Sequence, residues 1–187
     1  KGNILNGDHL RAMAATPIVF AMANPDPEIT YKDAHASRND IILATGRPDY
    51  PNQVNNVICF PFIFRGAMDV KATQINEAMK LAAVRAIADL AKQPVPEIVN
   101  LAYDKKNILF GKDYIIPKPL DPRLITAVAP AVAKAAIESG VAREKIVNWE
   151  AYEEELSKRL GHDNKLIKVI TSKARQNPQR VVFAEAD

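Results

Sequence analysis

The feature that most constrains the fold is an apolar run that stops abruptly. Residues 18–23 read Ile-Val-Phe-Ala-Met-Ala, and residues 24–27 read Asn-Pro-Asp-Pro. A continuous apolar run without polar alternation is typical of a strand covered on both faces, as in a parallel sheet. Because proline cannot donate to a ladder of backbone hydrogen bonds, we predict that this strand ends at Ala23.

Two further apolar runs, residues 41–44 and 57–60, extend the predicted sheet. A segment compatible with a helix, residues 30–37, lies between the first two strands. This spacing suits a right-handed crossover in a doubly wound sheet, where ligands bind beyond the carboxyl ends of the strands. The sequence therefore predicts an α/β fold with a partial, Rossmann-like parallel sheet, and it places Asn24 and residues 45–47 at two such ends.

The rest of the chain is predicted to be largely helical, because apolar residues recur at steps of three and four. Prolines interrupt this pattern, and from residue 148 onward the composition becomes more charged, as in a helical linker. We predict helices over residues 8–15, 66–91, 98–103, 122–140, 150–160 and 165–175, an extended segment over 114–122 and a short strand over 180–187.

Composition excludes several classes of protein. The 187 residues are 48% hydrophobic and 25% charged, without the ~20 consecutive apolar residues of a membrane helix. The net charge of +3 is small and its basic residues are interleaved with acidic ones, so we expect neither nucleic acid nor membrane as a partner. A single cysteine, Cys59, excludes an internal disulfide and favours a cytoplasmic location. The start, Lys-Gly-Asn, has neither methionine nor leader, so we expect a fragment.

Asn24 is the strongest candidate for a functional side chain. Its carboxamide is both a donor and an acceptor of hydrogen bonds, and Pro25 and Pro27 stiffen the loop that carries it. A carboxamide fixed at the end of a buried strand can orient a small substrate. The alternative is a turn residue or a cap for the following helix, roles that asparagine fills often.

A second candidate is the segment Asn-Gln-Val-Asn-Asn at residues 52–56, directly before the third predicted strand. Carboxamides bind a carboxylate or a hydroxyl without adding charge, which suits a small hydroxy acid or the carboxamide of nicotinamide. The alternative is a plain turn.

The charged candidates are weaker. Arg47 and Arg65 flank these amides and could neutralise an anionic ligand. His9, His35 and His162 are scattered without a partner at metal-ligand spacing, so we interpret them as structural. The chain contains neither of the usual glycine-rich phosphate motifs.

Three stretches together resemble the bacterial NADP-type malic enzymes. They read FAMANPDPEI, ATGRPDYPNQVNNVICFPFIFRGAMD and YIIPKPLDPRLITAVAPAVAKAAIESGVA, and the likeness extends over residues 1–160. The tail, TSKARQNPQRVVFAEAD, resembles the start of a phosphotransacetylase-type domain, as in the hybrid subfamily. The resemblance implies that residues 1–147 are the C-terminal portion of an NAD(P)-binding domain, and that residues 148–187 are a helical linker and the start of a phosphotransacetylase-like domain.

The resemblance also implies an activity, NADP-dependent malate dehydrogenase (oxaloacetate-decarboxylating), which converts malate to pyruvate and CO2. Its cofactors would be NADP or NAD and a Mg or Mn ion. By position in the motifs, Asn24 and Asn56 would bind malate. Asn24, Asn55 and Gly46 would contact the cofactor, with Asn55 beside the nicotinamide ribose. Pro48 stands where many relatives have serine, so no hydroxyl contact is expected there.

The family's acid and base, a tyrosine and a lysine, and its metal ligands belong to a segment that would precede Lys1. We therefore expect this chain to be inactive alone, with no catalytic or metal-binding residue of its own. We also expect it to form a homo-oligomer. The alternative is a noncatalytic oligomerisation module, which explains the long helices but not the amides.

Overall fold

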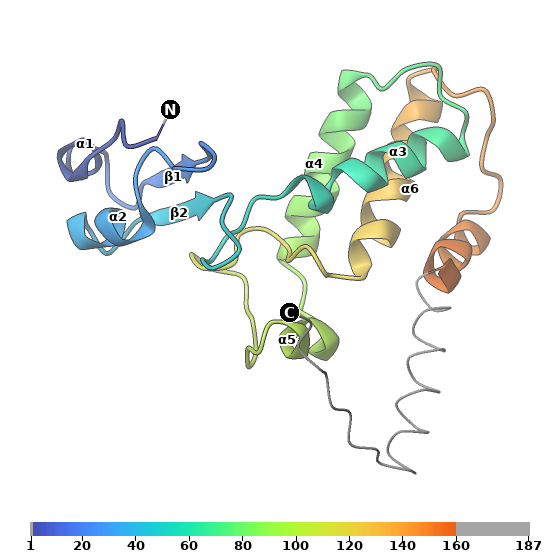
Figure 1. Cartoon of the computed structure of the whole chain (residues 1–187). Coiled ribbons are helices and arrows are strands. Elements are labelled where there is room, and N and C mark those ends of the chain that lie inside the picture. Colours follow the sequence, from blue (N-terminus) through green and yellow to red (C-terminus); the bar gives the residue numbers. More distant parts are fainter. Residues whose placement is uncertain (1, 160–187) are drawn as a thin grey trace, which may run out of the picture. The chain divides into compact units, whose positions relative to one another are not determined.

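The computed structural model describes residues 2–159. The chain divides into two compact units, residues 1–147 and 148–187, and the first contains all labelled helices and strands (Figure 1). The predicted helix at 165–175, the predicted strand at 180–187 and the tail that resembles a phosphotransacetylase lie outside the described residues.

The sheet of the described residues contains two parallel strands, β1 (Ile18–Ala21) and β2 (Ile42–Thr45). Ile18 pairs with Ile42, so both carboxyl ends lie at the same edge. Helix α2 (Tyr31–Ser37) connects the strands. This strand-helix-strand unit confirms the predicted α/β class.

The core of this part covers one face of β1. Its burial alternates, because Val19 and Ala21 are buried whereas Ile18 and Phe20 are exposed. The prediction of a strand covered on both faces is therefore wrong for β1 in the described residues. The buried face packs with residues of α1 (Gly7–Arg11), α2 and β2 and of the segments directly before α2 and β2: Leu10, Ile29, Ala34, Ile41 and Leu43.

Helix α1 ends earlier than predicted, and Arg38 binds carbonyls at this end. Its guanidinium donates hydrogen bonds to the carbonyl oxygens of Leu10, Met13 and Ala14, at 2.7 to 3.1 Å. The Leu10 carbonyl lies in the last turn of α1 and also accepts from the Met13 N–H, whereas the carbonyls of Met13 and Ala14 follow the helix. A side chain from the end of α2 thus binds the carbonyls at this end of α1. The helix stops at Arg11 instead of continuing to residue 15.

The prediction of a third strand over residues 57–60 is wrong. Asn56–Ile58 form a 3-10 turn, η1, and α3 (Phe60–Asp69) follows after Cys59. Pro61 lies in the first turn of α3, where its missing N–H is no loss to the helix. A short apolar run is compatible with either a strand or a helix, and here the proline favours the helix.

The predicted helix over 66–91 is two helices, α3 and α4 (Glu77–Ala91). Lys71 adopts a left-handed conformation with φ 48°, which ends α3. The side chain of Asn76 then accepts a hydrogen bond of 3.0 Å from the Met79 N–H and begins α4. The backbone of the intervening loop is held by Thr73 N–H, which donates to the Val141 carbonyl.

Helix α6 (Arg123–Glu138) packs against both α3 and α4 (Figure 1). It begins after Asp121, whose carboxylate accepts from the Arg123 N–H, and it continues through the buried Pro130. Helix α5 (Glu97–Ala102) confirms the prediction for 98–103. Both helix predictions in this region agree with the structure to within a few residues.

In the second unit, residues 149–159 are helical, as predicted for this part of 150–160. The Asn148 side chain accepts a hydrogen bond from the Ala151 N–H at its start. Among the described residues, no helix has both the length and the apolar composition needed to span a membrane.

Candidate functional site

A cavity of about 330 Å³ lies at the carboxyl ends of β1 and β2. The loops that leave the two strands supply its walls, so the structure brings Asn24 and Gly46 to one site, together with Arg47. The other residues that line it are Ala21, Ala23, Pro25, Pro27, Thr45 and Pro48.

The loop after β1 is fixed at several points. The peptide bond between Asn24 and Pro25 is cis. The Glu28 carboxylate accepts a hydrogen bond of 3.0 Å from the Ala23 N–H, and this bond lowers the pKa of Glu28. The Asn3 N–H also donates to the carbonyl of Pro27. The backbone that carries Asn24 is therefore held from both sides.

The carboxamide of Asn24 is exposed and forms no hydrogen bond with any described residue. It does not cap α2, because Thr30 does so through the Asp33 N–H. The alternative role as a helix cap is thus taken by another residue. The side chain remains available to a ligand in the cavity.

The loop after β2 is shaped by Thr45. Its carbonyl accepts from the Val54 N–H at 2.8 Å, and its hydroxyl accepts from the Arg47 N–H at 3.1 Å. A Cβ built on Gly46 would meet no atom within 4 Å, so the cavity is open above this residue. Arg47 forms an ion pair with Asp49 at 2.7 Å, and both side chains are exposed.

The structure assigns different roles to the amides of residues 52–56. Asn52 is buried and structural: its side chain hydrogen-bonds the backbone of Leu43, Lys112 and Ile115. Asn55 caps η1, accepting from the Val57 N–H at 3.0 Å. Both of these carboxamide groups thus have hydrogen-bond partners within the protein.

Asn56 differs from the other two asparagines. It is exposed, and its side chain has no hydrogen-bond partner among residues 2–159. Neither Asn55 nor Asn56 is among the residues that line the cavity of Asn24. The two side chains predicted to bind malate, Asn24 and Asn56, thus share their exposure and their lack of a partner.

The remaining candidates have structural partners. Arg65 forms an ion pair with Asp69, and the His9 ring accepts from the Asn6 N–H in a capping box. The His35 ring lies 4.3 Å from that of Tyr31. The structural interpretation of these two histidines is confirmed, whereas His162 lies outside the described residues.

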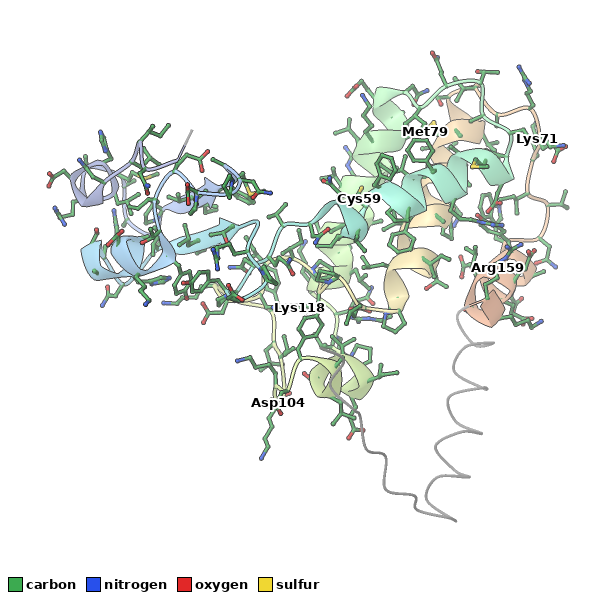
Figure 2. The ribbon with its side chains drawn as sticks, viewed as in Figure 1. Cys59, Lys71, Met79, Asp104, Lys118 and Arg159 are labelled. Carbon is green, nitrogen blue, oxygen red and sulfur yellow. The ribbon has the colours of Figure 1, made fainter. Side chains whose placement is uncertain are left out.

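Cys59 (Figure 2) is a free, half-buried thiol directly before α3, and burial raises its pKa. A neutral thiol of this kind is a poor nucleophile. Within residues 2–159, no group of three or more His, Cys, Asp or Glu side chains could hold a metal ion.

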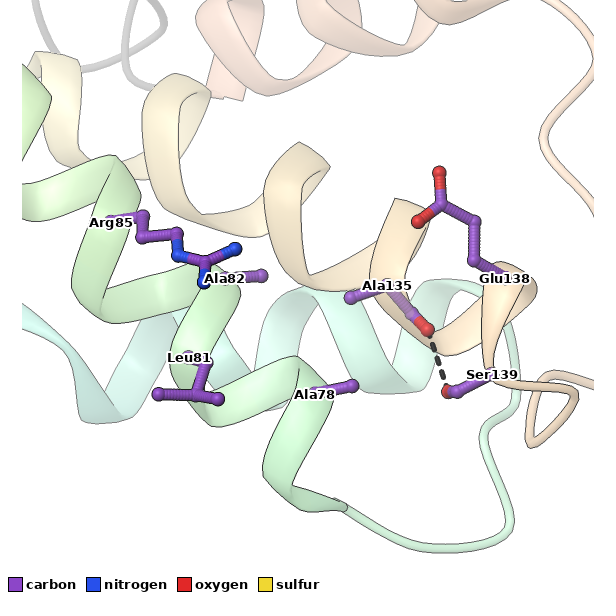
Figure 3. Close-up of a pocket in the computed structure, with 7 residues that line it drawn as sticks. All are labelled: Ala78, Leu81, Ala82, Arg85, Ala135, Glu138 and Ser139. Atoms are coloured by element: carbon purple, nitrogen blue, oxygen red, sulfur yellow. Dashed lines mark hydrogen bonds between the residues drawn. The ribbon is translucent and has the colours of Figure 1, made fainter.

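Two other cavities were not predicted from the sequence. One lies between α4 and α6, where the Ser139 hydroxyl donates to the Ala135 carbonyl at 2.6 Å (Figure 3). The other, next to Pro48, contains lysines and tyrosines that include Lys118 (Figure 2). Its lining combines residues 48–51 with 103–118, so no local motif could reveal it.

Comparison with known proteins places these features in a family. Residues 2–103 match the family model described as malic enzyme, NAD binding domain. The chain is 56% identical to an NADP-dependent malic enzyme of Haemophilus influenzae over 98% of this chain and 24% of that protein. It is 48% identical to an NAD-dependent malic enzyme of Rhizobium meliloti over 98% of this chain and 24% of that protein.

The solved structures agree. The crystal structure of malic enzyme from Pyrococcus horikoshii superposes on this chain with a TM-score of 0.73 and a sequence identity of 36%. The match covers 94% of this chain and 36% of the Pyrococcus horikoshii chain. The chain spans about a quarter of the length of the two relatives named above. The family match, the identities and the shared fold together show that this chain belongs to the malic enzyme family.

Proposed function

We propose that this chain forms part of the malate and nicotinamide site of an NADP-dependent malate dehydrogenase (oxaloacetate-decarboxylating), which oxidises malate to pyruvate and CO2. The observation that carries the proposal is the cavity of Asn24 and Gly46, in a chain whose first part matches the NAD-binding domain of malic enzymes. NADP or NAD supplies the hydride acceptor when bound.

The chain's own residues would bind malate and the cofactor and orient them. The Asn24 N–H groups would donate to a carboxylate or the hydroxyl of malate, and Asn56 would do the same from η1. The Asn55 Nδ2 group would face the nicotinamide ribose, because its Oδ1 already accepts from Val57. Gly46 would let the cofactor approach the backbone, since no atom fills the space above it.

Proton transfer requires a group that this cavity does not provide. Its lining contains no His, Lys, Tyr, Asp or Glu side chain, and the described residues do not provide a cluster of metal ligands. Carboxamides can position a hydroxyl, but they cannot accept its proton. The Mg or Mn ligands would therefore come from outside the described residues, and the acid and base from outside this lining.

We also propose the hybrid subfamily, in which residues 148–187 connect to a phosphotransacetylase-like domain. The support is the resemblance of the tail sequence. Mass spectrometry of the natural protein tests it, because a mass with no room for a second domain after residue 187 would contradict it. A cytoplasmic location is supported by the free thiol of Cys59.

A homo-oligomer is supported by an apolar stripe on α3. Phe60, Phe64 and Met68 follow one another at steps of four and are 60%, 42% and 70% exposed. The same stripe favours the alternative function, a noncatalytic oligomerisation module. Light scattering measures the association, but only an activity assay distinguishes the two functions.

The assay compares the 187-residue chain with a longer malic enzyme that contains it. The longer enzyme should reduce NADP with malate and a Mn ion, and the 187-residue chain alone should not. Malate-dependent reduction by the chain alone would refute the argument about proton transfer. An inactive but fully folded longer protein would refute the enzyme function and favour the oligomerisation module.

A further inference from the structure

A second cavity, of about 500 Å³, lies where the loop after β2 meets the segment that follows α5. Volumes of this size are typical of sites for small organic molecules. Polar side chains gather in its lining, three lysines and three tyrosines: Lys105, Lys106, Lys118, Tyr50, Tyr103 and Tyr114.

Buried hydrogen bonds build this cavity. The Asn52 Nδ2 group donates to the Leu43 carbonyl at 3.1 Å and to the Lys112 carbonyl at 2.7 Å. Its Oδ1 atom accepts from the Ile115 N–H at 2.9 Å. One buried side chain thus joins strand β2 to the segment that carries Lys118, so the two walls are held together without a ligand.

The turn with the other two lysines is also defined. Asp104 and Asn107 flank it in the left-handed region, with φ 48° and 57°, a conformation that these residue types tolerate. The Asn100 side chain accepts from the Ile108 N–H at 2.9 Å. Lys105 and Lys106 are therefore placed at the cavity by an ordered turn.

The three lysines of the lining lack acidic partners within residues 2–159. Among the described residues, none of the three forms an ion pair. Lys118 is half-buried with its Nζ atom 5.3 Å from the centre of the Tyr103 ring. Burial and the charge of Lys105 lower the pKa of Lys118. Of the two carboxylates in the lining, Asp49 pairs with Arg47, which leaves Asp113.

Tyr114 is a buried part of the cavity wall. Its side chain is 2% exposed, and its hydroxyl has no hydrogen-bond partner among the described residues. Arg123 lies beside it, but that guanidinium is bound to Asp121 and to the Pro94 carbonyl, and no hydrogen bond of normal geometry joins it to the phenol. Burial raises the pKa of Tyr114 to about 12, so the hydroxyl keeps its proton.

We propose that this cavity binds a phosphate-bearing organic anion through Lys118, Lys105 and Lys106. Lysine ammonium groups bind phosphate as compact positive charges. Three of them carry more positive charge than a ligand with a single carboxylate would neutralise. The tyrosines, with Ile108 and Leu109, provide an apolar wall for the organic part. The proposal goes beyond malate binding and does not depend on it.

The phosphate could come from two sources. Pro48 lines both this cavity and that of Asn24, so a dinucleotide could extend from one to the other. A separate mononucleotide could also fill this cavity. Both share the chemistry of a phosphate attached to a planar organic group, and competition between ligands distinguishes them.

Titration calorimetry of the 187-residue chain with ADP and with pyrophosphate, at constant ionic strength, tests the proposal. We expect saturable binding of one ADP per chain, weakened about tenfold or more in Lys118→Met and Lys105→Met. Lys145→Met, at an exposed lysine outside the cavity, should bind as the parent does.

Adding NADP to the ADP complex identifies the source. Displacement of ADP by NADP would support a dinucleotide phosphate, and simultaneous binding would support a separate mononucleotide. Absence of saturable binding by both ADP and pyrophosphate would overturn the proposal. Equal weakening by Lys145→Met and Lys118→Met would also overturn it, because the attraction would then depend only on net charge.

Discussion

The Nδ2 atom of Asn52 lies 2.7 Å from the carbonyl oxygen of Lys112, a residue 60 positions later in the chain. The same side chain also bonds to the backbone of Leu43 and Ile115. A carboxamide that the sequence offers as a ligand-binding group is thus a connector of the fold. It places the loop after β2, where Gly46 and Arg47 line the candidate site.

Asn52→Ala should destabilise the protein by roughly 3 kcal/mol, because it leaves two carbonyls and one N–H without their buried partner. Urea unfolding followed by circular dichroism measures the loss. Asn39→Ala is the matched control at an exposed asparagine and should change stability by less than about 0.5 kcal/mol. Equal stability of the two variants would contradict the role of Asn52.

Gly66→Ala should destabilise the packing of α3 against α6 by about 1–3 kcal/mol. A Cβ at Gly66 would collide with the Ala129 carbonyl oxygen and lie 2.9 Å from Val132 Cβ. Gly111→Ala is the control, since its Cβ would meet nothing within 4 Å. Thermal unfolding compares the two, and a melting temperature for Gly66→Ala at or above that of the parent would show that the helices do not pack this closely.

The ion pair of Arg38 and Asp40 should make stability depend on pH. Two hydrogen bonds of 2.7 Å from Arg38, with one from the Thr16 N–H, hold the pKa of Asp40 well below its ordinary value. The stabilisation is therefore complete above the unfolded-state pKa of about 4 and is lost as the pH falls toward the folded-state pKa.

Asp40→Asn should thus be less stable than the parent at pH 7, and the difference should shrink as the pH falls below about 4. Unfolding titrations at several pH values measure this. A constant difference between pH 7 and pH 2 would indicate that the charge of Asp40 contributes nothing.

Gly46→Ala separates stability from binding. The added methyl group meets no protein atom, so the melting temperature should stay the same. If the cofactor approaches this backbone, the methyl group enters its space, and the KM for NADP in a longer enzyme that contains this chain should rise by about tenfold, or ~1.4 kcal/mol. An unchanged KM would remove Gly46 from the proposed cofactor site.

The sequence predicts the strand-helix-strand unit well, because its signals are local. Apolar runs define β1 and β2, and Thr30 with Asp33 marks the start of α2. Strand β1 ends at Ala21, two residues earlier than predicted, and Asn24 and the prolines lie in the loop that follows it. Parallel strands then bring Asn24 and Gly46 to one edge, a relationship that follows from topology alone.

The errors come from contacts that a local pattern does not contain. Residues 57–60 are the exception: they are apolar enough for a strand, but the local signal of Pro61, which lies in the first turn of α3, favours a helix. The break between α3 and α4 depends on Lys71 in a left-handed conformation and on a loop bound to Val141, at the end of another helix. Asn52 could not be separated from Asn56 without knowing which of them is buried.

The central claim is that Asn24 and Asn56 bind malate, and malate affinity tests it most directly. In a longer malic enzyme that contains this chain, Asn24→Ala and Asn56→Ala should each weaken malate binding by fivefold or more, or about 1 kcal/mol, while Asn39→Ala leaves it unchanged. Folding should be normal in all three, because these side chains have no hydrogen bonds within the described residues. Malate binding in Asn24→Ala and Asn56→Ala equal to that of the parent would contradict the account.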